Sequence, residues 1–193
     1  IFIHNVDTFL GKALVKELRK IDGQFNRMFG TVLTGAENAP KAVKRIVSRD
    51  DVKKAKKMAE TISSCGIVIM DLFNSTMDDL HFAITSLKVD PKSTPPKPLD
   101  ELGRDVVFVL ISSVQVWAGT QPQEGFLSDG DYLQRTPISG SKYELWKELE
   151  DLVMNCFNRE GSTVKGLIVS GGILYGDGED TFATLFKDAW RGG

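Results

Sequence analysis

Short apolar runs that are rich in β-branched residues recur along the chain and predict β-strands. The runs do not alternate between apolar and polar positions, which is typical of strands that are buried on both faces of a sheet. The expected strands are Ile1–Ile3, Thr31–Thr34, Arg45–Ser48, Ile67–Leu72, Val106–Ser112 and Val164–Val169.

Between these strands, apolar residues recur at helical spacing. The expected helices are Leu10–Lys20, Asp51–Ser64, Thr76–Val89, Ser139–Asn158 and Thr181–Trp190. Alternation of strands and helices predicts an α/β fold with an open, doubly wound parallel sheet and right-handed crossovers. We therefore expect residues 1–193 to form a single Rossmann-like domain. Four prolines between residues 90 and 103 predict a surface loop within it.

Composition narrows the class of function. The 193 residues include 24 Lys and Arg against 26 Asp and Glu, so the chain lacks the positive field of a dedicated nucleic-acid-binding protein. Its apolar runs are too short to span a membrane. Two cysteines are too few for a disulfide framework and favour free thiols in the cytoplasm. Because the chain opens inside an expected strand, we expect it to be a segment of a longer chain.

The turn after the first strand bears on cofactor binding. In dinucleotide-binding folds this turn is rich in glycine, which permits the tight turn, the approach of the backbone to the pyrophosphate and close helix packing. Here the three positions hold Asn5, Thr8 and Gly11. Asn5 tolerates a left-handed backbone and Gly11 keeps the packing role, but the β-branched Thr8 occupies space that phosphate oxygens need. We expect a structural turn without a cofactor; a working NAD(P) site is the alternative.

Three further motifs follow in order. Residues 111–117 read Ile-Ser-Ser-Val-Gln-Val-Trp, residues 136–142 read Thr-Pro-Ile-Ser-Gly-Ser-Lys, and residues 174–178 read Leu-Tyr-Gly-Asp-Gly. With the turn, they resemble the motifs of the extended short-chain dehydrogenases/reductases. The resemblance implies that Ser113 polarises the substrate, that Lys142 is the active-site lysine, and that Ile138 replaces the proton-donating tyrosine. It also implies that the C-terminal substrate-binding lobe of that family is absent from this chain.

The isoleucine predicts a vestigial site. It has no titratable proton, and neither Ser113 nor Lys142 can supply the missing proton transfer, so we expect no catalytic residue. A Tyr-x-x-x-Lys pair is also present at Tyr143 and Lys147. At about 100° per residue, helical phase places Ile138 and Lys142 on the apolar stripe and turns Tyr143 and Lys147 toward solvent. We interpret the second pair as a coincidental match.

The motifs at 111–117 and 174–178, together with the ending Leu-Phe-Lys-Asp-Ala-Trp at residues 185–190, more narrowly resemble the dehydrogenase-like region of ciliary adenylate kinases. That resemblance implies a non-catalytic scaffold in the axoneme of a cilium, with protein partners there and kinase activity in another part of the chain. It implies no cofactor, nucleic acid or membrane contact, and it leaves a homodimer open. The alternative is an NAD(P)-dependent epimerase or reductase of the extended family with an altered active site.

A basic run and one histidine complete the candidates. The basic residues are interrupted by Asp50 and Asp51, and we interpret the run as a solvated helix face, with docking to an acidic surface as the alternative. His4 has no cysteine or carboxylate at metal-ligand spacing, so we expect no metal site. The run consists of Lys41, Lys44, Arg45, Arg49, Lys53, Lys54, Lys56 and Lys57.

Overall fold

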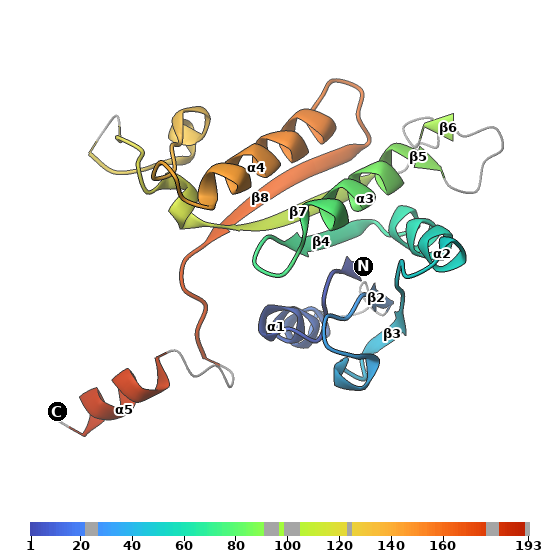
Figure 1. The fold of residues 1–193 in the computed structure, drawn as a ribbon, viewed down its shortest axis with the longest axis horizontal. Helices are drawn as coiled ribbons and strands as arrows, with labels where there is room; N and C mark the ends of the chain where they lie inside the picture. The colour runs from blue at the N-terminus through green and yellow to red at the C-terminus, as the bar shows by residue number, and fades with distance from the viewer. Residues whose placement is uncertain (22–26, 91–96, 99–104, 123–124, 177–181, 192–193) are drawn as a thin grey trace.

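A computed structural model describes residues 1–21, 27–90, 97–98, 105–122, 125–176 and 182–191. Six parallel strands form one sheet in the order β3-β2-β1-β4-β7-β8 (Figure 1). The order reverses between β1 and β4, so the expected doubly wound, Rossmann-like α/β sheet is confirmed. The strands are β1 (Phe2–Ile3), β2 (Met28–Gly30), β3 (Val43–Ile46), β4 (Ile67–Asp71), β7 (Val106–Ser113) and β8 (Val164–Gly171).

Helices lie on both faces of the sheet, and Figure 1 shows α3 and α4 running alongside β7 and β8. Successive side chains of a strand point to opposite faces. Phe2 and Phe108 enter one core with apolar residues of α2, α3 and α4, whereas Ile3 and Ile111 enter a second core with Val15 of α1. The described helices are α1 (Phe9–Leu18), α2 (Val52–Ser63), α3 (Met77–Lys88), α4 (Tyr143–Phe157) and α5 (Ala183–Trp190).

Two expected boundaries are wrong. Residues 31–34 are a loop rather than a strand. Val6 donates its N–H to the Thr31 carbonyl, and the Asp7 carboxylate accepts from the N–H groups of Leu33 and Thr34. The fourth helix was expected from Ser139, but α4 begins at Tyr143. Gly140 has a φ of 75°, which lies in the left-handed region and cannot continue a right-handed helix.

Two outer parts of the chain add detail. The proline-rich segment includes a small antiparallel pair, β5 (Val89–Asp90) and β6 (Lys97–Pro98); the rest of the loop expected between residues 90 and 103 falls largely outside the described residues. Helix α5 has no buried residue and lies apart from the sheet (Figure 1). Within the part of the chain that the structure describes, no helix is both long and apolar enough to cross a membrane.

Candidate functional site

The turn between β1 and α1 is built as a tight structural turn. Asn5 has a φ of 55°, so the left-handed backbone expected there is confirmed. Its Nδ2 donates to the Asn74 carbonyl at 2.7 Å, and its own N–H donates to the Thr31 hydroxyl at 2.8 Å. A Cβ at Gly11 would overlap the carbonyl oxygen of Asn5. Only glycine therefore lets α1 approach the turn this closely.

Thr8 occupies the N-terminus of α1. Its Oγ1 accepts from the Gly11 N–H at 3.1 Å and donates to the Asn5 carbonyl at 2.8 Å, so Thr8 is the N-cap of the helix. Free N–H groups at a helix N-terminus are what a bound phosphate uses. In this chain the Thr8 hydroxyl already accepts from one of those donors, the Gly11 N–H, and the threonine side chain occupies the space beside that N–H.

The neighbouring Asp7 ties the turn to the loop after β2. Its carboxylate accepts from the N–H groups of Leu33 and Thr34 at 2.8 and 2.7 Å and from the Thr34 hydroxyl at 2.6 Å. The residue is only 6% exposed. Burial raises the pKa of Asp7, but the hydrogen bonds from Thr34 and Leu33 outweigh it, so its pKa lies below the ordinary value. A negative charge is thus fixed close to where a pyrophosphate would lie.

The turn also connects to the end of β4. Asn74, which accepts from Asn5, donates its N–H and its Nδ2 to Asp71 Oδ1 at 2.8 and 3.0 Å. Asp71 is buried, and burial raises its pKa despite these bonds. A buried carboxyl with a raised pKa at the carboxyl end of a parallel strand marks a candidate functional position. In this chain Asp71 positions Asn74, whose carbonyl oxygen accepts from Asn5 in the turn.

An open cleft lies where β1, β4, β7 and β8 end. Its volume is about 510 Å³, and ligands of open α/β sheets bind at these carboxyl ends. The polar groups on its wall come from Asn74, Ser113, Gln115 and Tyr143, and the rest is mainly apolar. Ser113 accepts from the N–H of Gln115 at 3.2 Å through Oγ, which fixes the serine at the cleft wall.

The helical-phase argument for the tyrosine is wrong. Tyr143 is partly buried against the core and lines the cleft with Ser113, whereas Ile138 is 58% exposed. Residues 138–142 precede α4 and are not helical, so helical phase does not predict how Ile138 is oriented relative to Tyr143. Lys142 is exposed, with its Nζ 5.3 Å from the centre of the Tyr143 ring. Lys147 points elsewhere and pairs with Asp151 at 3.0 Å.

A buried ion pair joins α4 to the segment that precedes it. Arg135 is 1% exposed and Glu150 is 0% exposed. The arginine Nε lies 2.8 Å from Glu150 Oε2, and Nη2 lies 2.6 Å from Asp151 Oδ1. Its guanidinium also lies 3.7 Å from the centre of the Tyr132 ring, and burial raises the pKa of Tyr132 to about 12. This network fastens the 3₁₀ helix η4 (Asp129–Gln134) to α4.

His4 belongs to a polar cluster rather than a metal site. Its Nδ1 lies 3.1 Å from Ser75 Oγ, and its Nε2 lies 3.8 Å from Asp79 Oδ1. The set has the composition of a Ser-His-Asp triad, but 3.8 Å is too long for a hydrogen bond, and Asp79 is held by Thr76 and Arg49. Among the described residues, no group of metal-ligating side chains comes together.

Sequence reasoning missed the residues that close the turn from the side. Asp7, Asp71 and Asn74 carry no distinctive sequence signal, because isolated acidic and amide residues near strand ends are common in turns. The available signal was position, since Asp71 ends β4 while Asp7 and Asn74 follow β1 and β4, which end at the same edge of the sheet. The three positions named from the sequence, Asn5, Thr8 and Gly11, do come together in one turn.

Comparisons with known proteins follow the fold. No protein-family model and no curated protein matches the chain. The nucleoside-diphosphate-sugar epimerase of Agrobacterium tumefaciens superposes with a TM-score of 0.60 at 14% identity, covering 97% of this chain and 57% of that one. The chain has the fold of the short-chain dehydrogenases/reductases. A superfamily member from A. tumefaciens with bound NAD gives a TM-score of 0.52 at 18% identity over 88% of this chain and 48% of its own.

A third solved structure, acetoin dehydrogenase from Enterobacter cloacae, has a TM-score of 0.52 at 14% identity and covers 94% of this chain and 78% of its own. At these identities the likeness concerns the fold alone. The chain spans about half the length of the first two structures. All three share the Rossmann-like fold of this chain, and none of them supports the narrower resemblance to ciliary adenylate kinases.

Proposed function

We propose that this chain is a dehydrogenase-fold module that contacts other proteins and does not transfer hydride. The observation that carries the proposal is the turn after β1, where the Thr8 hydroxyl accepts from one backbone donor at the start of α1 and the Asp7 carboxylate binds the loop after β2. A phosphate that used the Gly11 N–H would have to displace the Thr8 hydrogen bond, which contributes about 1 kcal/mol. A cofactor would also approach the Asp7 carboxylate with a pyrophosphate of like charge.

The proton-transfer position supports the same proposal. Ile138, at the position where the family resemblance implies a tyrosine, is more than half exposed and has no titratable proton. Lys142 is exposed and lies against aromatic rings rather than beside a hydroxyl. The three residues that the motif would align for proton exchange are therefore not a working set.

The context of this module is also a proposal. The narrower sequence resemblance supports a place in the axoneme of a cilium, with nucleoside monophosphate kinase activity in another part of a longer chain and with protein partners in the axonemal assembly. It rests on the motifs at residues 111–117, 174–178 and 185–190. We expect no bound cofactor, nucleic acid or membrane in that setting, and a homodimer is the simplest competing assembly.

A titration tests the proposal directly. NADH and NADPH are added to the purified chain while their fluorescence and the heat of binding are followed. We expect no saturable binding at cofactor concentrations up to about 1 mM, which corresponds to less than about 4 kcal/mol of binding free energy. Micromolar binding of either cofactor would overturn the proposal.

A second candidate function is an NAD(P)-dependent epimerase or reductase with an altered site. The observation that favours it is the cleft, where Ser113 and Tyr143 line one wall, and the enzymes that share the fold favour it at the level of the fold. Here Tyr143 would take the place of the missing tyrosine as proton donor. If oxidoreductase activity is found, Tyr143→Phe should abolish it, and Ile138→Ala should leave it unchanged.

A further inference from the structure

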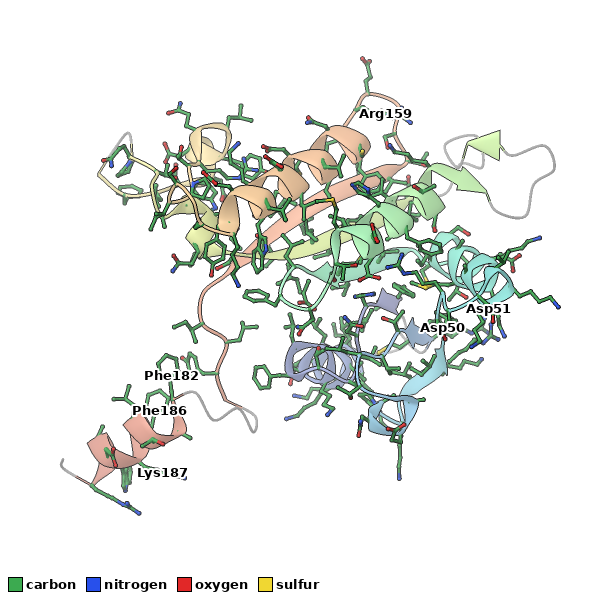
Figure 2. The ribbon with its side chains drawn as sticks, viewed as in Figure 1. Asp50, Asp51, Arg159, Phe182, Phe186 and Lys187 are labelled. Atoms are coloured by element: carbon green, nitrogen blue, oxygen red, sulfur yellow. The ribbon has the colours of Figure 1, made fainter. Side chains whose placement is uncertain are left out.

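A basic groove lies between α2 and the outer strands of the sheet. It has a volume of about 510 Å³ and is open to solvent. In Figure 2, nitrogen-tipped side chains project from α2 beside the labelled Asp50 and Asp51. The side chains that line it include Phe29, Arg45, Lys53, Lys56, Lys57 and Glu60.

The charges around the basic groove are not balanced. Four cationic side chains face one carboxylate, Glu60, although the whole chain has a net charge of −2. Among the described residues, no carboxylate lies within ion-pair distance of Lys53, Lys56 or Lys57, whereas Lys54 on another side of α2 pairs with Asp50 at 3.2 Å. The unpaired lysines of this helix are therefore those that line the basic groove.

This arrangement destabilises the free protein slightly. Lys53 lies three and four residues before Lys56 and Lys57, and like charges at these helical spacings repel by a few tenths of a kcal/mol per pair. Arg45 is held differently, with its guanidinium 5.9 Å from the centre of the Phe29 ring. A guanidinium can donate two parallel hydrogen bonds to a carboxylate. A negatively charged occupant would relieve the repulsion and accept these hydrogen bonds.

We propose that the basic groove binds an acidic, extended segment of a partner protein. The inference deepens the proposed function, because it names the surface and the chemistry of the protein contact. From Lys53 to Ser64 the groove follows α2 for about 16 Å at 1.5 Å per residue, which is the length of about five extended residues at 3.3 Å each. Its wall combines four cationic side chains with one aromatic ring, a mixture that suits a peptide of glutamate and aspartate.

Fluorescence anisotropy with a labelled peptide tests the inference. The probe carries about five consecutive glutamates, and a matched peptide carries glutamine in their place. We expect binding of the glutamate peptide alone, weakening as salt is raised because the contacts are exposed. The double variant Lys53→Glu/Lys57→Glu should weaken binding about tenfold or more, since two attractive contacts become repulsive.

The matched control reverses two exposed lysines elsewhere, Lys165→Glu/Lys187→Glu, which gives the same net charge and should leave the affinity unchanged. The milder Lys53→Gln/Lys57→Gln covers the case in which charge reversal disturbs folding, and it should lose about half of the effect in free energy. Equal loss in the control, no binding of the glutamate peptide, or equally tight binding of an oligothymidylate of equal charge would overturn the inference.

The outcome is separable from that of the proposed function. NADH is titrated into the same preparations. If both the glutamate peptide and NADH bind, the inference about the basic groove stands and the proposed non-catalytic function is wrong. If neither ligand binds, the inference about the basic groove is wrong and the proposed function stands.

Discussion

Two regions at the carboxyl edge of the sheet differ in how they use their polar groups. At the turn after β1, Asp7 and Thr8 direct their oxygens back to backbone donors of their own chain. At the end of β7, Ser113 accepts from a single backbone N–H, that of Gln115, and borders an open cleft together with Tyr143. In a dinucleotide-binding protein both regions hold parts of one ligand. Here the turn is held together by hydrogen bonds within the chain, whereas the cleft at the end of β7 is open.

The largest expected effect concerns the buried ion pair on α4, the helix that also supplies Tyr143 to the open cleft. Arg135→Ala should lower the free energy of unfolding by about 4 kcal/mol, because it leaves the fully buried Glu150 without its cation. The control Lys147→Ala removes a partly exposed partner of Asp151 and should change stability by less than about 1 kcal/mol. Urea unfolding measures both. Equal losses of stability in the two variants would show that the buried ion pair stabilises the fold no more than the partly exposed one does.

Gly11→Ala comes next and tests the turn after β1. The added Cβ would overlap backbone atoms of Asn5 and Val6, which cannot move without displacing β1, so we expect a loss of about 3 kcal/mol. Gly66→Ala is the matched control, since a Cβ there meets no atom within 4 Å. Thermal unfolding compares them. A Gly11→Ala variant as stable as Gly66→Ala would contradict the close packing of α1 on the turn.

Asp7→Asn should lower stability by about 2 kcal/mol at neutral pH, because one amide oxygen replaces a carboxylate that accepts three hydrogen bonds. The folded state lowers the pKa of Asp7, so the carboxylate stabilises it above the unfolded pKa of about 4. This contribution is lost as the pH falls through the lower folded pKa. The gap between wild type and variant should therefore narrow in acid. A gap that does not change with pH, or one matched by the exposed Asp78→Asn, would refute the role of this carboxylate.

The smallest effect belongs to Thr8. Replacing this N-cap with alanine should cost about 1 kcal/mol of stability, whereas Thr8→Ser keeps the hydroxyl and should cost much less. Chemical denaturation of the pair of variants isolates the hydroxyl from the rest of the side chain. If serine and alanine are equally destabilising, the hydroxyl is not the group that closes the turn.

Much of this molecule could be predicted from sequence. Continuous β-branched runs such as Val106–Ser112 predicted the strands of the doubly wound parallel sheet, although the expected burial on both faces is wrong for β7 and β8, where Val107 and Leu167 are exposed. The positions of Asn5 and Gly11 predicted a tight turn, because few residues accept a left-handed backbone or such close packing. These features depend on local sterics and periodicity, which a single sequence records.

Only the tertiary structure decided where the polar groups point. The orientation of Tyr143 depended on where α4 begins, and Gly140 set that boundary through its left-handed backbone. Thr31–Thr34 has the β-branched composition of a strand, yet Asp7, more than twenty residues away, holds it as a loop. Hydrogen bonds between segments distant in sequence leave no periodic signal, so the sequence determined the sheet, whereas the folded chain determined which of its pockets stayed open.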